Sequence, residues 1–162
     1  MPISSKPKNF RDGTIPLSDG SGSPITLTVQ YQAGDFSISN VMQGQTEVEV
    51  YLDRGSFHNV RQTNFAPATF SFTATMTDLS DATNKCLWDA VNKTGAFAAG
   101  VSRGDTDVWL LLVGFTVEGT NFGDATDHTL TLDKCHLTIE FAEGSPNTFT
   151  LNGTVYGAIT AT

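Results

Sequence analysis

The sequence predicts a mainly β protein: an antiparallel β-sandwich or small barrel with one flanking α-helix. Periodicity is the first reason, because about seven short segments alternate apolar and polar residues and only one has helical spacing. Composition is the second, since charged residues make up only 16% of the chain while Thr, Ser, Asn and Gly are abundant. Length is the third: 162 residues support one ordinary core, so we expect a single domain over residues 1–162.

The N-terminal part predicts an arm followed by a hairpin. Residues 1–12 contain two prolines and three basic residues with little apolar periodicity, which is typical of an arm that lies on a partner's surface. Residues 14–31 predict a short strand, a Gly/Ser turn and a second strand. The alternating apolar positions of the second strand are Ile25, Leu27, Val29 and Tyr31.

The next predicted strand, residues 47–53, has two different sides. Its apolar side carries Val48, Val50 and Leu52. Its opposite, acidic side carries Glu47, Glu49 and Asp53. Successive side chains of a strand point to opposite faces, so the three acids share one face.

Residues 54–66 are predicted to form a long loop. This segment contains Phe57, Val60 and Phe65, apolar side chains that a solvated loop does not need. It also carries Arg54 and Arg61. We therefore expect the loop to pack on another surface.

A Phe-rich strand and the single helix follow. Alternation of Phe70, Phe72, Ala74 and Met76 with Thr and Ser indicates a strand with one buried face. A helix is predicted over residues 81–93. Its expected caps are Ser80 and Asp81, its expected end lies near Gly95, and its apolar stripe holds Cys86, Leu87, Ala90 and Val91.

The C-terminal half predicts the centre of the sheet. Residues 108–117 are apolar on both faces, as in a strand covered on two sides. Within 128–141 the apolar parity shifts by one residue, which predicts a bulge or bend near Asp133 and Lys134. The last strand begins near Phe149 and keeps one apolar parity.

We find no constellation of residues that supports catalysis or a cofactor. The chain lacks a Gly-x-Ser-x-Gly motif, a phosphate-binding Gly-rich loop followed by Lys, and a Cys/His pair with an orienting acid. Adjacent Cys135 and His136 point to opposite faces of a strand, so a metal site is not expected. Glu47 and Glu49 have a spacing that a glycosidase could use, but a solvated acidic face is the simpler interpretation.

Charge and the cysteines limit the partners and the compartment. A formal net charge of −8 argues against a surface that grips nucleic acid, since Lys and Arg supply most of that affinity. The sequence shows neither a signal peptide nor a membrane span, so we expect no membrane anchor and folding in the cytoplasm. Cys86 and Cys135 are then expected to be buried thiols and not a disulfide.

The layout of the chain resembles the major tail (tail tube) proteins of long-tailed, non-contractile bacteriophages. The resemblance depends on Tyr51-Leu52-Asp53-Arg54-Gly55, on the long loop and Phe-rich strand, on the helix with Leu87-Trp88, and on Glu140-Phe141-Ala142-Glu143-Gly144-Ser145-Pro146-Asn147. It implies a tail-tube-like fold and homo-hexameric rings stacked into a hollow tube. The tube would belong to the virion tail, assembled in the cytoplasm of a bacterial host. Other implied partners are the tape measure, tail terminator and tail tip proteins, while DNA passes through without specific binding.

Two sets of residues receive roles from this interpretation. The arm and the loop are long, partly apolar and basic, which suits contacts with acidic neighbouring subunits. The candidates for these inter-subunit contacts are Phe10, Arg11, Arg54, Phe57, Val60, Arg61 and Phe65. Carboxylates repel phosphate, so the acid face of residues 47–53 is the hypothesis for the lumen. These lumen candidates are Glu47, Glu49 and Asp53.

Two alternatives stay open at this point. One is a monomeric β-sandwich module that binds a glycan or a protein, such as a decoration domain. Such modules usually display an aromatic platform, whereas Trp88 and Trp109 lie in patterns that indicate burial. The other is the inner tube protein of a contractile injection machine, which the sequence separates poorly from a phage tail tube.

Overall fold

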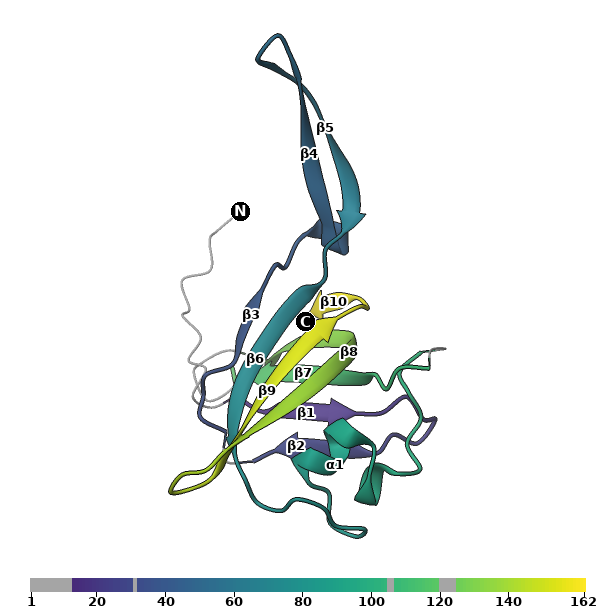
Figure 1. Cartoon of the computed structure of the whole chain (residues 1–162), viewed down its shortest axis with the longest axis vertical. Coiled ribbons are helices and arrows are strands. Elements are labelled where there is room, and N and C mark those ends of the chain that lie inside the picture. Colours follow the sequence, from purple (N-terminus) through teal and green to yellow (C-terminus); the bar gives the residue numbers. More distant parts are fainter. Residues whose placement is uncertain (1–12, 31, 105–106, 120–124) are drawn as a thin grey trace.

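The computed structural model describes residues 13–30, 32–104, 107–119 and 125–162 (Figure 1). Phe10 and Arg11 of the expected N-terminal arm lie outside these residues. The described strands are β1 Ile15–Ser18, β2 Thr26–Val29, β3 Ser37–Ser39, β4 Thr46–Asp53, β5 Ser56–Phe65, β6 Ala68–Thr75, β7 Leu111–Val117, β8 His128–Ala142, β9 Thr148–Val155 and β10 Ile159–Ala161. The helical elements are α1 Leu87–Asn92 and two 3-10 turns, η2 Gln43–Gln45 and η3 Gly95–Phe97.

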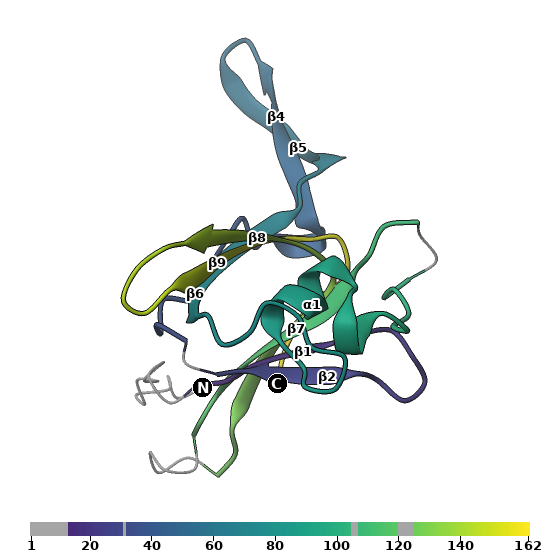
Figure 2. The same ribbon diagram turned by 60° about the horizontal axis from the view of Figure 1, so that its bottom comes forward.

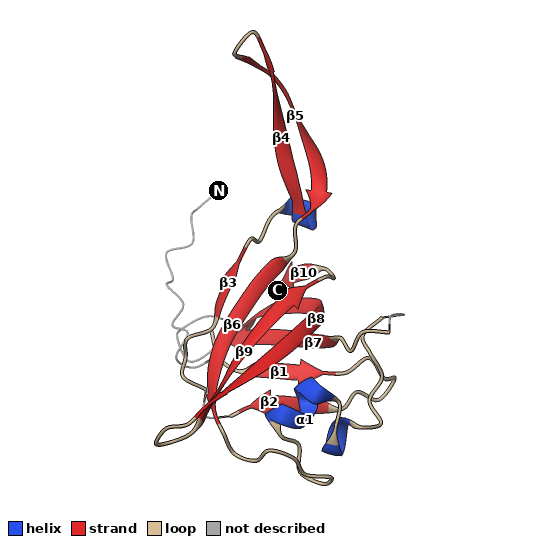
Figure 3. Ribbon diagram, in the orientation of Figure 1, coloured by secondary structure: helices blue, strands red, loops and turns tan. Residues whose placement is uncertain are grey.

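Eight of the strands form one antiparallel sheet that folds over on itself, and β4 and β5 form a separate hairpin (Figure 3). The order along the large sheet is β2-β1-β7-β8-β9-β6-β3, and β10 pairs with β8. An isolated bridge between Gln32 and Ala74 joins the segment after β2 to β6, so the sheet approaches closure. This confirms the predicted mainly β, antiparallel fold with one helix. We call this sheet together with α1 the body.

The long strand β8 belongs to both layers of the body. Its first half pairs with β7 and β10, and its second half pairs with β9. The register with β7 shifts between Leu111 and Val113, which oppose Cys135 and Leu132, so β8 holds one extra residue there. Lys134 has a φ of 53°, and the bulge lies where the change of apolar parity predicts it.

The core lies between the two layers. On β6 the predicted alternation holds, with Phe70, Phe72 and Ala74 buried. The other inward positions of the described residues interdigitate with them, and the side chains with 0% exposure include Leu17, Phe97, Val113, Leu132 and Leu151. Both cysteines are free and buried, as predicted.

The helix is shorter than predicted because a buried carboxylate shapes the segment before it. Asp89, in the first turn of α1, accepts hydrogen bonds from Ser80 Oγ (2.8 Å), the Asp81 amide (2.9 Å), Cys86 Sγ (2.9 Å) and Thr94 Oγ1 (2.6 Å). Ser80 and Asp81 therefore turn the chain around Asp89 and do not cap a helix that begins at residue 81. The N-cap position is Cys86, five residues after Asp81 and six after Ser80.

A second buried carboxylate, Asp19, fixes the turn after β1. It accepts from the Ile25 amide (2.7 Å), Ser21 Oγ (2.9 Å) and the Val101 amide (2.9 Å). Burial opposes its ionisation, but the two amides and the hydroxyl outweigh burial and lower the pKa of Asp19. The sequence analysis found neither this group nor Asp89.

Candidate assembly surface

The most unusual region is the hairpin of β4 and β5, which projects from the body in both orientations of the ribbon (Figures 1 and 2). All ten residues of β5 and all but the first residue of β4 are exposed. The segment 54–66 is therefore mostly a strand, and the prediction of a long loop was wrong. The error arose because Phe57, Val60 and Phe65 do not alternate as they would in a half-buried strand.

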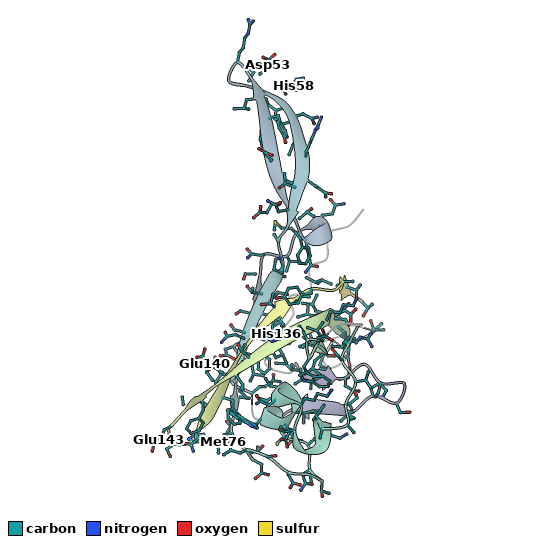
Figure 4. The ribbon with its side chains drawn as sticks, turned by 45° about the vertical axis from the view of Figure 1, so that its right-hand side comes forward. Asp53, His58, Met76, His136, Glu140 and Glu143 are labelled. Atoms are coloured by element: carbon teal, nitrogen blue, oxygen red, sulfur yellow. The ribbon has the colours of Figure 1, made fainter. Side chains whose placement is uncertain are left out.

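A two-residue turn closes this hairpin. Asp53 pairs with Ser56, and between them Arg54 and Gly55 have φ values of 48° and 86°. Positive φ at both central positions is the signature of a type I′ turn, whose twist matches that of the flanking strands. The stretch Leu-Asp-Arg-Gly therefore marks the tip of the hairpin, where Asp53 and His58 lie in Figure 4.

One face of the hairpin is apolar and open. The register pairs Val48 with Gln62, Val50 with Val60, and Leu52 with Phe57. Paired residues of antiparallel strands point to the same face, so these side chains form one surface, which we call the apolar strip. Its apolar members are Val48, Val50, Leu52, Phe57 and Val60. Phe57 exposes 68% of its surface and Val48 exposes 64%, so the predicted apolar side of residues 47–53 is correct but is not buried by this chain.

The opposite face of the hairpin is polar. It carries Glu49 paired with Arg61, Tyr51 paired with Asn59, and Asp53. The Tyr51 hydroxyl donates to Glu49 Oε2 at 2.9 Å, and the Arg61 guanidinium carbon lies 5.6 Å from the centre of the Tyr51 ring. The hydrogen bond to Glu49 and its negative charge raise the pKa of Tyr51.

The root of the hairpin is tied to the body by two contacts. The Gln45 side chain is buried, and its Nε2 donates to the Val155 carbonyl at 3.1 Å. Phe65, at the end of β5, stacks on Tyr156 with ring centroids 6.5 Å apart. The hairpin is therefore anchored at one end only.

The structure brings most of the predicted site residues together on this hairpin. Glu49 and Asp53 lie on its polar face, and the period of two puts Glu47 on that face as well. Phe57 and Val60 belong to the apolar strip, Phe65 to the root, Arg54 to the turn and Arg61 to the polar face. The sequence analysis missed Val48, Val50 and Leu52 as contact candidates, since their alternation indicated an ordinary buried face.

Elsewhere in the described part of the chain, the residues show the features of a packed body. Trp109 donates to the Ala90 carbonyl at 2.8 Å, and Trp88 packs against Phe149 with centroids 6.3 Å apart. Both tryptophans are half-buried. No group of three or more His, Cys, Asp or Glu side chains suited to a metal occurs in the described ranges. None of the helices described there is long and apolar enough to span a membrane.

Comparison with known proteins gives a likeness of fold and none of sequence. No family model matches the chain. No curated protein matches it. Among solved structures, it resembles a chain of "an Extracellular Contractile Injection System, PVC sheath/tube terminator in extended state", with a TM-score of 0.55, 10% identity, and coverage of 100% of this chain and 97% of that one. The fold is tail-tube-like.

Two weaker likenesses have TM-scores too low to support a common fold. A chain of the anti-feeding prophage (AFP) baseplate gives a TM-score of 0.48 with 11% identity, covering 100% of this chain and 96% of that one. An Hcp protein gives 0.36 with 14% identity, covering 93% and 98%. Of these three likenesses, the one at 0.55 therefore carries the statement of fold.

Proposed function

We propose that this protein is a structural subunit that assembles with copies of itself into the rings of a tail or injection tube. The observation that carries the proposal is the apolar strip of the hairpin. Two-stranded hairpins are marginally stable in water, and contiguous exposed apolar surface marks an interaction site in soluble proteins. A hairpin that is held only at its root and exposes Val48, Val50, Leu52, Phe57 and Val60 therefore favours a partner that covers it. The tail-tube-like fold supports a tube as the setting.

In this proposal the two faces of the hairpin have different roles: the apolar strip contacts a neighbouring subunit and the polar face lies at or near the lumen. If the apolar strip packs on a neighbouring subunit, the polar face with Glu49 and Asp53 points away from that contact. A ring of six, the number that the resemblance to tail tube proteins implies, has a formal charge of six times −8, or −48. Such a charge repels DNA phosphates and lets DNA pass without binding. Glu47, Glu49 and Asp53 remain the proposed acids at or near the lumen.

A direct test is the state of assembly of the purified protein. We expect rings or tubes in negative-stain images and a concentration-dependent size by analytical ultracentrifugation. Replacing residues 47–64 by Gly-Asn-Gly joins Thr46 to Phe65, which are already paired, and should give a folded monomer. A full-length chain that stays monomeric at every concentration, and binds a glycan instead, contradicts the proposal.

The acid hypothesis has its own test. Replacing Glu47, Glu49 and Asp53 by Lys should leave ring formation intact and slow the passage of DNA through the tube, because the added charges attract phosphate. The control variant replaces the same three residues by Gln, Gln and Asn, which removes charge without reversing it. Unchanged ejection kinetics in the Lys variant would exclude these residues from the lumen.

A contractile injection machine is a second setting, favoured by the full-length likeness at a TM-score of 0.55 to a chain of a contractile system. Images of the assembly separate a tube protein from a terminator, and binding of a sheath protein separates the two settings. Long tubes are expected from a tube protein of either kind, whereas single rings that add to a tube end are expected from a terminator. Tubes that bind a sheath protein in a pull-down indicate the contractile setting.

A further inference from the structure

The body carries an apolar cavity beside the root of its own hairpin. It is an open cavity of about 550 Å³ lined by Val108, Leu110, Lys134, His136 and Tyr156. The bulge of β8 shapes its floor, because the Tyr156 amide donates to the Lys134 carbonyl at 3.1 Å across the bulge. His136 lies on the adjoining part of β8 (Figure 4). We call these five residues the groove.

The groove continues through Tyr156 into a second cavity of about 530 Å³ at the hairpin root. That cavity is lined by residues 41–45 and 156–159. Large apolar side chains are exposed along both cavities: Val41, Val108 and Tyr156 each expose about half of their surface, and Met42 exposes over a third. The chain's own hairpin leads away from this surface, as the ribbon shows (Figure 1).

We propose that the groove receives the apolar strip of the hairpin from a second copy of this chain. This inference rests on the proposed function and adds the surface on which the hairpin docks. The strip and the groove are both apolar. The volume of the groove lies within the range of protein clefts that bury most of a ligand's surface, roughly 300–1,000 Å³. The tip residue Phe57, whose ring is the most exposed of the strip, supplies an aromatic anchor of the kind that dominates interface energetics.

The chain itself carries an exposed apolar surface that can cover the groove, the apolar strip of a second copy. The polar face of that hairpin, with Glu49 and Asp53, points away from the groove, so the contact is made by the two apolar surfaces. One chain therefore supplies both complementary halves of the contact.

The geometry of this contact is head-to-tail. The tip of the hairpin is about 26 Å from its root, given eight residues of β4 at about 3.3 Å each, whereas the groove lies beside the root. A contact between two different surfaces of the same chain is heterologous, and it repeats from subunit to subunit until a ring closes or a stack grows. Each subunit thus gives one hairpin and receives one.

Cross-linking between two separately prepared variants tests the pairing. Leu52→Cys on the strip and Val108→Cys in the groove are mixed and treated with a short bismaleimide, and we expect a covalent dimer that neither variant gives alone. The matched control is Glu49→Cys, on the opposite face of the same strand, mixed with Val108→Cys. Since Cys86 and Cys135 are buried, the unsubstituted chain gives the background.

Charge substitutions test the same contact without a reagent. Val108→Arg should weaken assembly by about 30-fold or more, as loss of a central contact does. Leu79→Arg places the same charge on another exposed apolar residue, remote from the groove, and should leave assembly unchanged. Circular dichroism should report a folded body for both variants.

The outcomes separate this inference from the proposed function. Rings that form while the Leu52 and Glu49 variants cross-link equally to Val108→Cys overturn the groove as the receiving surface and leave the tube proposal standing. If Val108→Arg and Leu79→Arg assemble equally well, the groove is likewise excluded as the receiving surface and the tube proposal stands. An unsubstituted chain that never assembles overturns both proposals.

Discussion

The body and the hairpin both contain strands in which apolar and polar residues alternate, but the apolar side chains are buried in the body and exposed on the hairpin. On β6, Phe70 and Phe72 alternate with Thr and Ser and are buried within the chain. On β4, Val48 and Val50 alternate with Glu and are exposed. Alternation therefore reports that one face of a strand will be covered, but it does not report whether the cover comes from the same chain.

The largest expected effect sharpens this comparison with two phenylalanines. Phe72→Ala should lower the free energy of unfolding by about 3–5 kcal/mol, because it leaves a cavity in the packed core. Phe57→Ala removes the same side chain from the hairpin and should change monomer stability by less than about 0.5 kcal/mol. Thermal unfolding of the two variants at a concentration that keeps the chain monomeric measures both effects.

For assembly, we expect the opposite order of effects: Phe57→Ala should weaken assembly more than Phe72→Ala does. Phe57→Ala is expected to shift the concentration at which rings form upward by about 30-fold, as truncation of an aromatic anchor does. Phe72→Ala, refolded at low temperature, should assemble almost as the unsubstituted chain does. If Phe57→Ala destabilises the monomer as much as Phe72→Ala, the hairpin is part of the core and the comparison fails.

Asp89 provides the next largest effect, of about 3 kcal/mol. Its carboxylate is fully buried and gathers donors from Ser80, Asp81, Cys86 and Thr94, so Asp89→Ala leaves these donors without their acceptor. On the hairpin, Glu49→Ala removes an exposed carboxylate and should cost less than about 0.5 kcal/mol. Chemical denaturation curves of the two variants provide the measurement.

The pH dependence of stability should also come from the body. Burial opposes ionisation of Asp89, but hydrogen bonds from Cys86, Thr94, Asp81 and Ser80 outweigh it and lower its pKa from 3.8 to about 2. A carboxyl whose folded pKa lies below its unfolded value stabilises the fold at pH above about 4, and that stability is lost as pH falls toward 2.

Denaturation at several pH values checks this expectation. The slope contributed by Asp89 is at most about 1.4 kcal/mol per pH unit, the limit for one proton. Asp89→Asn should flatten the curve between pH 4 and 2. Equal curves for the unsubstituted chain and Asp89→Asn contradict the assignment.

The sequence predicts the body well and the hairpin poorly, for a physical reason. The bulge at Asp133 and Lys134 was predictable. When the apolar positions of a covered strand shift by one residue, the strand must contain an extra residue. The hairpin was not predictable, because both faces of β5 are exposed in the monomer. In addition, β5 has one extra residue between Phe57 and Val60, which breaks the alternation of its apolar side chains. Buried Asp19 was missed because one of its donors, the Val101 amide, is 82 positions away. The donors to Asp89 lie within nine positions, but Ser80 and Asp81 were assigned as helix caps and not as donors to a buried carboxylate.

The turn Arg54-Gly55 did carry a usable signal. A Gly after a short polar run between two apolar segments predicts a hairpin most strongly when Asn or Asp precedes it, and here Arg occupies that position. The sequence analysis gave these residues to a loop. Knowing the turn, a search for an alternating pattern on each side of Gly55 would have found β4 but not β5.

That turn gives the smallest predicted effect and the finest test of the comparison. Arg54 adopts a φ of 48°, which strains most L residues and suits Asn. Arg54→Asn should therefore stabilise the hairpin by about 0.5 kcal/mol and slow amide exchange in β4 and β5. Because the hairpin is joined to the body only at its root, exchange of the buried amides of β6 and β9 should not change. Slower exchange throughout the chain would mean that the hairpin and the body unfold together, whereas slowing confined to β4 and β5 shows that the assembly surface folds as its own unit.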